Sequence, residues 1–369
     1  MKNILDSLKR HTIFALISML IVGYILVALF LVYFLNHNLL QSDVLGYWQD
    51  SLNWRTPFHS FHVPGYPLLI ALLNGMTFNA LHPLWLMELI NLAAFTISLY
   101  LLNLVIRLLT NNETYAALGM LLFGLWPFVG LTYTVLPLAD MPVLCLFLAG
   151  FYYLLRSKML PAGIFFGLAL ITHKAIWIFV LLVIVFEMIR RKELFTKNIV
   201  VLITTTILPL ALLWIFGAVY HQSAFWLISS NLNVEIASKG QLPVLDGILG
   251  TLLQGGMKGA VKGLIIIGFM AIGMAALILN LKSRIEFRYW GLAISLGILA
   301  LFLILNQHEI WAAVRFSRLL VIPLAIGLPA SAARLFTHKH SLAMIVTVLC
   351  LFFLSQFAYA WYVAQVFYA

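Results

Sequence analysis

The sequence predicts an all-α protein, a polytopic bundle of transmembrane helices that carries amphipathic helices on its surface. Hydrophobic residues make up 63% of the chain and charged residues 9%, whereas soluble domains carry about 25% charged residues. The apolar residues also gather in runs of about 20, the length that crosses the hydrocarbon core of a bilayer. We expect one transmembrane domain over residues 1–369, with no soluble domain of useful size.

About eleven apolar runs qualify as transmembrane helices. The pair on either side of Lys174 is the least certain, because both runs are short. The expected spans are 12–35, 82–106, 115–132, 138–155, 159–173, 174–189, 198–219, 263–281, 289–306, 317–335 and 341–366.

The basic residues orient this bundle. With the N-terminus inside, 15 of the 22 lysines and arginines fall on the cytoplasmic side, as the positive-inside rule expects. They are Lys2, Lys9, Arg10, Arg107, Arg156, Lys158, Arg190, Arg191, Lys192, Lys197, Lys282, Arg284, Arg288, Arg334 and Lys339. The pattern predicts an N-in, C-out topology and accounts for the net charge of +10 without a nucleic-acid partner.

Two long segments, 36–81 and 221–262, then lie on the outer side. The first is unusually polar for this chain and ends in a Pro-Gly-Tyr-Pro turn. Within it, Asp43, Tyr47, Asp50 and Trp54 are spaced to share one face of an amphipathic helix. We expect a second short helix at Leu68–Met76, which is too short to span the membrane.

The two aspartates of the first helix are candidates for proton transfer or ligand binding. Asp43 follows the first span at the membrane surface, where a carboxylate can accept a proton from an incoming hydroxyl or amine. Asp50, two turns later, is a candidate second polar ligand. For each, a solvated surface charge is the alternative interpretation.

Two further acids lie in or beside spans. Glu88 falls in the outer half of the second span, where an ionisable group is costly and often functional; a structural pairing with a neighbouring helix is the alternative. Asp140 precedes Met141-Pro142 at a helix start, so a capping role competes with a role in a cavity.

Four basic side chains are candidates for binding a phosphate group. His173 and Lys174 face outwards between two apolar runs, although Lys174 can also extend to the lipid interface. Arg315 and Arg318 lie at i and i+3, on one helix face, where a late span begins. Contact with lipid head groups is the alternative for both arginines.

Other chemistries find little support in the sequence. The histidines lack the spacing of a metal site, and both cysteines, Cys145 and Cys350, lie inside apolar runs. The chain has no GxxxxGK[ST], GxSxG or GxGxxG motif, so binding of soluble nucleotides is not expected.

Several segments, taken in order, resemble the integral-membrane glycosyltransferases of the GT-C class, which includes protein mannosyltransferases and aminoarabinose transferases. An acidic residue stands in the first outer loop, and four motifs follow it along the chain. The motifs are Val63-Pro64-Gly65-Tyr66-Pro67-Leu68-Leu69, Pro137-Leu138-Ala139-Asp140-Met141-Pro142, the run GIFFGLALITHK that ends at Lys174, and RFSRLLVIPLAIGLP from Arg315.

This resemblance implies a transferase that moves a sugar from a polyprenyl- or dolichyl-phosphate donor to a glycan, lipid or protein acceptor on the outer side. Asp43 would act as the general base in an inverting displacement. Lys174, Arg315 and Arg318 would neutralise the leaving phosphate. Aromatic side chains of the first loop, Tyr47, Trp48 and Trp54, would line the sugar pocket. A requirement for a divalent cation stays open.

Two other functions compete with this one. A transporter or lipid flippase would use Glu88 and Lys174 along a substrate path. A structural subunit of the cell envelope would not need Asp43, Lys174 and both arginines on one side. Convergence of these charges at the outer end favours the enzyme, whereas polar residues near the midplane favour the transporter. We expect the protein in a prokaryotic plasma membrane.

Overall fold

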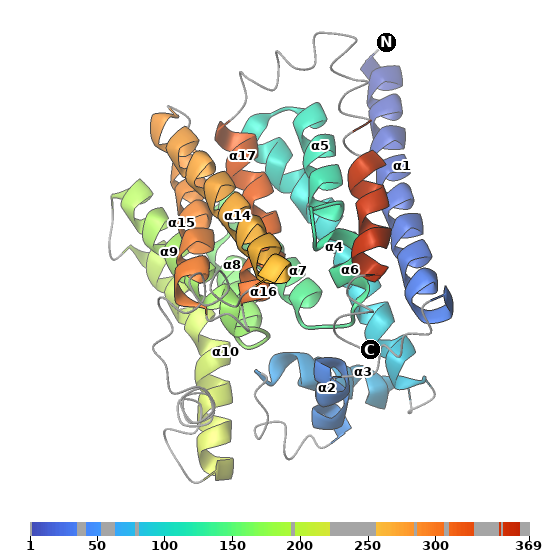
Figure 1. The fold of residues 1–369 in the computed structure, drawn as a ribbon. Helices are drawn as coiled ribbons and strands as arrows, with labels where there is room; N and C mark the ends of the chain where they lie inside the picture. The colour runs from blue at the N-terminus through green and yellow to red at the C-terminus, as the bar shows by residue number, and fades with distance from the viewer. Residues whose placement is uncertain are drawn as a thin grey trace.

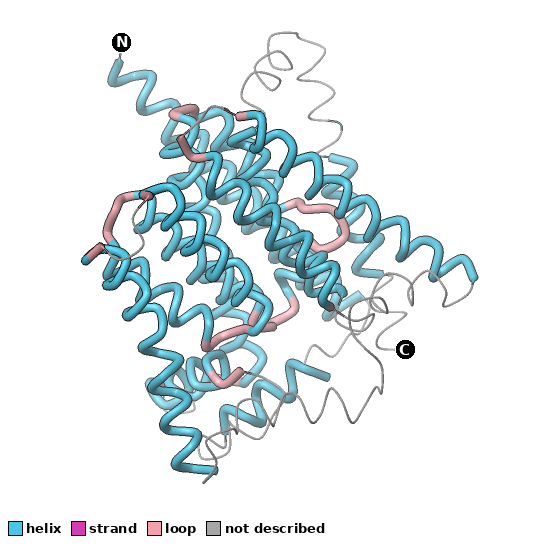
Figure 2. The backbone as a smooth tube through the Cα atoms, turned by 90° about the vertical axis from the view of Figure 1, so that its left-hand side faces the viewer, coloured by secondary structure: helices cyan, strands magenta, loops and turns pink. Residues whose placement is uncertain are grey.

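The computed structural model describes residues 2–34, 42–52, 63–77, 81–192, 196–221, 256–283, 286–305, 310–327, 347 and 350–361. Within these ranges every regular element is a helix and no strand occurs, which confirms the all-α class. Most of the helices run roughly along one direction, so the molecule is a bundle with two ends (Figure 1). The view turned by 90° shows the same bundle, with the described loops drawn as short pink segments between its helices (Figure 2).

The helices follow the apolar runs of the sequence. In chain order they are α1 (Lys2–Leu29) with a π-helical turn (Phe30–Phe34), α2 (Ser42–Leu52), α3 (Gly65–Met76), α4 (Pro83–Thr110), α5 (Glu113–Gly124), α6 (Gly130–Val135), α7 (Asp140–Leu155), α8 (Met159–Leu170), a 3₁₀ segment (Lys174–Ile176), α9 (Trp177–Arg191), α10 (Lys197–His221), α14 (Gly256–Lys282), α15 (Arg288–Ile304), α16 (Ile310–Phe316), a 3₁₀ segment (Ser317–Leu320) and α17 (Val321–Gly327). A last described helix covers Cys350–Trp361.

Five segments of the described chain are long and apolar enough to cross a membrane. They are Ile13–Tyr33, Leu84–Thr110, Lys197–Val219, Gly259–Lys282 and Ile310–Gly327. Shorter apolar helices stand at four more of the expected spans, namely Asp140–Leu155, Met159–Leu170, Arg288–Ile304 and Cys350–Trp361. The chain is therefore a membrane protein, and the total of eleven spans and the N-in topology stay predictions.

One expected span, 115–132, is not continuous. It divides into α5 and α6, and residues 125–129 between them form turns. Pro127 lacks a backbone N–H and disfavours helix in the residue before it, so the helix ends ahead of it. Phe128 then adopts a left-handed backbone with φ 63°. The break places polar backbone inside the bundle.

Two other boundaries differ from the expected ones. The outer segment expected at 221–262 ends earlier, because α14 already begins at Gly256; residues 222–255 lie outside the described part. The span expected at 317–335 begins earlier, because α16 starts at Ile310.

Close packing of small residues joins α8 to α10. A Cβ added at Gly163 would overlap Oγ1 of Thr205, and one added at Gly167 would lie 2.7 Å from the carbonyl oxygen of Thr206. Small residues four apart let two membrane helices approach closely enough for their backbones to touch. The contact fixes α8, whose last turn reaches the candidate site.

The two helices of the first outer segment, α2 and α3, pack on one another at one end of the bundle (Figure 1). Val44 and Tyr47 of α2 are buried, whereas Leu45 and Leu52 are exposed. Ser42 is the first helical residue of α2. Trp54 lies outside the described residues.

Candidate functional site

The candidate site lies at the end of the bundle where α7 and α16 begin. Nη1 of Arg315 donates to Oδ2 of Asp140 at 2.7 Å, and both side chains are largely buried. Nε of Arg315 donates to the carbonyl oxygen of Trp311 at 3.3 Å, and the guanidinium lies 5.4 Å from the centroid of the Tyr133 ring. Arg315 is therefore held on three sides.

The expected capping role of Asp140 is wrong. Asp140 is the first helical residue of α7, the cap position is Ala139, and no side chain caps this helix. The carboxylate turns to Arg315 instead, because a buried charge needs a partner of opposite sign. Its other oxygen, Oδ1, is buried and accepts no hydrogen bond from the described residues.

The side chains of α2 complete this charged group. Burial raises the pKa of the Tyr47 phenol above its ordinary value. Three carboxylates raise that pKa further, those of Asp140, Asp43 and Asp50, and the guanidinium of Arg315 opposes them. All four charges therefore act on one phenol. Asp43 itself is exposed, and Asp50 is half-buried. We call these five residues the acid–arginine cluster.

The Pro-Gly-Tyr-Pro turn connects the acid–arginine cluster to two other segments, the one that contains Ile171 and the one that contains Pro137. The backbone N–H of Gly65 donates to the carbonyl oxygen of Ile171 at 2.7 Å, and a Cβ at this position would overlap that oxygen. The hydroxyl of Tyr66 donates to the carbonyl oxygen of Pro137 at 3.2 Å. The rings of Tyr47 and Tyr66 meet edge to face, with centroids 5.0 Å apart.

A second hydrogen bond fixes the turn before α7. Nδ2 of Asn91 donates to the carbonyl oxygen of Leu136 at 2.9 Å. Together with the hydrogen bond from Tyr66 to Pro137, this bond fixes the consecutive carbonyl groups of Leu136 and Pro137, shortly before α7. The position of Asp140 therefore depends on α3 and α4 as well as on α7.

His173 and Lys174 lie at the same end. Nδ1 of His173 accepts the backbone N–H of Ala175 at 3.1 Å, and its ring centroid lies 5.3 Å from that of Phe316, the neighbour of Arg315. His173 thus caps the 3₁₀ segment, while the side chain of Lys174 is exposed.

Arg318 behaves differently from Arg315. It is 3% exposed, and its nitrogen atoms bind protein oxygen atoms. Nη1 donates to Oγ1 of Thr134 at 3.0 Å, Nη2 to the carbonyl oxygen of Val129 at 3.1 Å, and Nε to that of Arg315 at 3.1 Å. Because Val129 ends the break between α5 and α6 and Thr134 lies in α6, Arg318 stabilises the interrupted span.

Trp126 and Ser317 tie the same two segments together. Nε1 of Trp126 donates to Oγ of Ser317 at 2.8 Å, inside the bundle. This contact and the role of Arg318 escaped the sequence interpretation, which treated 115–132 as one span. Pro127 in the middle of an apolar run was the available signal.

Glu88 has a partner on α1. The hydroxyl of Tyr24 donates to its Oε2, while Oε1 is buried and accepts no hydrogen bond from the described residues. Burial raises the pKa of Tyr66 well above its ordinary value, and Tyr47, Glu88 and Asp140 raise it further. Glu88 therefore lies close to Tyr66 of α3, at the border of the acid–arginine cluster. The structural pairing considered for it is present.

The structure thus brings together nine of the ten predicted site residues at one end of the bundle, the tenth being Trp54, which is not described. Among the described residues, no group of three or more His, Cys, Asp or Glu side chains is placed to hold a metal ion. Comparison with known proteins gives no matching family model and no matching curated protein.

Proposed function

We propose that the protein is a membrane glycosyltransferase that moves a sugar from a polyprenyl-phosphate donor to an acceptor on the outer side of the membrane. The observation that carries this proposal is the buried pair of Arg315 and Asp140 beside Tyr47 and the exposed Asp43. It supplies a fixed cation and a solvent-accessible carboxylate at the membrane end where a lipid-linked donor and a polar acceptor meet.

In the proposed reaction, the carboxylate of Asp43 accepts the proton of the acceptor hydroxyl. The hydroxyl oxygen then forms a bond to the anomeric carbon, and the bond from that carbon to the phosphate oxygen breaks. The electron pair leaves with the polyprenyl phosphate. Arg315 and Lys174 stabilise the charge that develops on it, and an arginine fixed before the reaction does so at little reorganisation cost.

This proposal revises the part assigned to Arg318. Its donors already bind Val129, Thr134 and Arg315, so it positions Arg315 and leaves the phosphate to Arg315 and Lys174. The sugar contacts Tyr47 and the aromatic residues of the first outer segment.

The test is sugar release by purified protein in lipid, with a panel of radiolabelled polyprenyl-phosphate sugars and of acceptors. We expect Asp43→Asn to abolish turnover, because an amide cannot accept the proton, and to leave the unfolding temperature unchanged, because Asp43 is exposed. The control is Gln49→Ala, at an exposed position of the same helix outside the cluster, which should retain most of the activity.

Two results would count against the proposal in different ways. Full activity of Asp43→Asn would remove Asp43 as the base while leaving the enzyme class intact. No consumption of any donor by the folded wild type would contradict the enzyme class itself.

One observation favours a transporter or lipid flippase, namely the buried carboxyl of Glu88 inside a candidate span. Glu88 is five residues from the start of α4, about 8 Å along the helix axis at 1.5 Å per residue. That position is near the bundle end, whereas transport sites lie near the midplane. Substrate uptake into vesicles that Glu88→Gln abolishes would support the transporter.

A further inference from the structure

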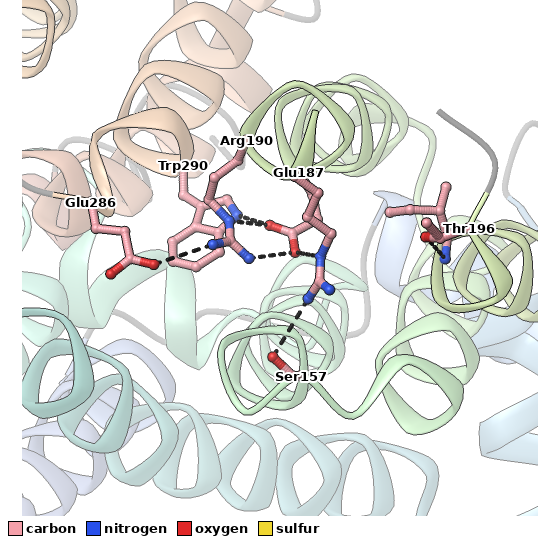
Figure 3. Close-up of polar contacts among 8 residues, drawn as sticks. Ser157, Glu187, Arg190, Thr196, Glu286 and Trp290 are labelled. Atoms are coloured by element: carbon pink, nitrogen blue, oxygen red, sulfur yellow. Dashed lines mark hydrogen bonds and ion pairs between the residues drawn. The ribbon is translucent and has the colours of Figure 1, made fainter. Parts of the chain in front are cut away.

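A second polar cluster lies where α7 and α9 end, at the end of the bundle opposite the candidate site at which both helices begin. It surrounds Glu187 of α9 (Figure 3). Glu187 is fully buried, and its carboxylate accepts four N–H groups. Arg190 donates two of them, from Nε and Nη2 at 2.9 Å each, Arg191 donates one from Nε at 2.6 Å, and Trp290 donates one from Nε1 at 3.0 Å. These four N–H groups saturate the carboxylate.

Arg190 is fully engaged within this cluster. Besides its two bonds to Glu187, its Nη1 donates to Oε1 of Glu286 at 3.3 Å. Its guanidinium also stacks on Trp290, 4.9 Å from the ring centroid. Arg190 therefore joins α9 to α15 and has a structural role.

Arg191 is held along one edge and open along the other. Its Nε is fixed by Glu187, whereas its Nη2 reaches Oγ of Ser157 only at 3.5 Å, beyond the usual hydrogen-bond range. Within the described part of the chain, Nη1 of Arg191 makes no hydrogen bond. A guanidinium and a hydroxyl so placed match the oxygen atoms of a phosphate group.

The surroundings are basic and lie at the end that the charge pattern predicts to be cytoplasmic. Exposed or half-buried cations flank the pair, and Glu286, 71% exposed, is an acid beside them among the described residues. These cations are Arg156, Lys158, Lys192 and Arg288. Anionic phospholipids concentrate in the cytoplasmic leaflet and attract such groups by about 1 kcal/mol per basic residue.

We propose that Arg191 and Ser157 bind the phosphate of an anionic phospholipid head group from the leaflet at this end. Glu187 fixes the arginine before the lipid arrives, so binding loses little side-chain freedom. The site connects the ends of α7 and α9, and a bound lipid would stabilise that junction. It is independent of the proposed glycosyltransferase activity.

The test is retention of added phosphatidylglycerol, compared with phosphatidylcholine, by detergent-purified full-length protein in native mass spectrometry. We expect wild type to retain phosphatidylglycerol preferentially. Arg191→Gln should weaken retention about tenfold, which corresponds to the loss of a charge-assisted hydrogen bond. Ser157→Ala should weaken retention less than Arg191→Gln does. Because Ser157→Ala leaves the contacts of Glu187 intact, it tests the site even if Arg191→Gln fails to fold.

The control is Arg156→Gln, which removes the same charge from a neighbouring exposed position, where the guanidinium lies 5.8 Å from the centroid of the Tyr152 ring. In detergent no charged leaflet attracts an exposed cation, so this variant should leave retention within about twofold, as for surface charges away from a site. Equal losses for Arg156→Gln and Arg191→Gln would overturn the proposal in favour of diffuse attraction. So would equal retention of the two lipids, or binding of inorganic phosphate without binding of phosphatidylglycerol.

Discussion

Arg315 and Asp140 form an ion pair across 175 residues of sequence, with Nη1 2.7 Å from Oδ2 and side chains 17% and 11% exposed. Removal of one partner of such a pair leaves the other charge buried, at a cost of about 3–5 kcal/mol. We therefore expect Asp140→Asn and Arg315→Gln each to lower the thermal unfolding temperature in detergent, and each to abolish activity.

The double variant, Asp140→Asn with Arg315→Gln, distinguishes this pairing from two unrelated effects. Because neither unpaired charge remains, its loss of stability should be clearly smaller than the sum of the single losses. Strictly additive losses, measured as unfolding temperatures under the same conditions, would mean that the pair does not couple α7 to α16.

The contact between α8 and α10 gives a second prediction, tested at two glycines. Gly163→Ala should lower the unfolding temperature, because the added Cβ meets Thr205 and also the carbonyl oxygen of Leu202 at 2.7 Å. Gly268→Ala, inside α14, has open space around its Cβ. There the lower backbone entropy of alanine should leave stability unchanged or raise it by about 0.5–1 kcal/mol. Equal losses at both sites would contradict the close approach.

The third prediction concerns alkaline pH. Burial raises the pKa of Tyr47, so the folded state holds the phenolic proton more tightly than the unfolded state, where tyrosine titrates near 10. This contribution to stability is complete below about pH 10 and is lost as the pH rises above it. Tyr47→Phe should reduce the fall in unfolding temperature between about pH 10 and 11. Tyr33→Phe, 71% exposed in wild type, is the control and should leave that fall unchanged.

The sequence was sufficient for the all-α class, because the bilayer selects directly for composition and for the length of apolar runs. An apolar run of about 20 residues becomes a helix that satisfies its own backbone in lipid, as for Leu84–Thr110 and Lys197–Val219. The run 115–132 breaks this rule, because Pro127 ends the helix and other parts of the protein satisfy the freed backbone.

The sequence named candidate site residues but did not predict how they pair. The order of the motifs placed Asp140 and Arg315 among the candidates, and spacing suggested that Arg315 and Arg318 act together. Spacing along one helix does not reveal which acceptors a distant segment presents. The oxygen atoms of Val129 and Thr134 occupy Arg318, and only the tertiary structure brings them to it.

The last prediction tests the different roles proposed for two basic residues, a structural role for Arg318 and donor binding for Lys174. An ammonium group cannot reach Val129, Thr134 and Arg315 together as the guanidinium of Arg318 does. Arg318→Lys should therefore lower the unfolding temperature, while the folded fraction keeps the KM of wild type for the donor. Lys174→Gln, at an exposed position, should show the reverse, an unchanged unfolding temperature and a raised donor KM.

Both quantities are measured on the same preparations, with kinetics normalised to folded protein from size-exclusion chromatography. If Arg318→Lys keeps its unfolding temperature and raises the donor KM, Arg318 binds the phosphate and the helix break is held by other contacts, such as that of Trp126 with Ser317. If Lys174→Gln leaves the donor KM unchanged, Arg315 is the cation that remains for the leaving phosphate. The first result would change the role assigned to Arg318, and the second would change the role assigned to Lys174.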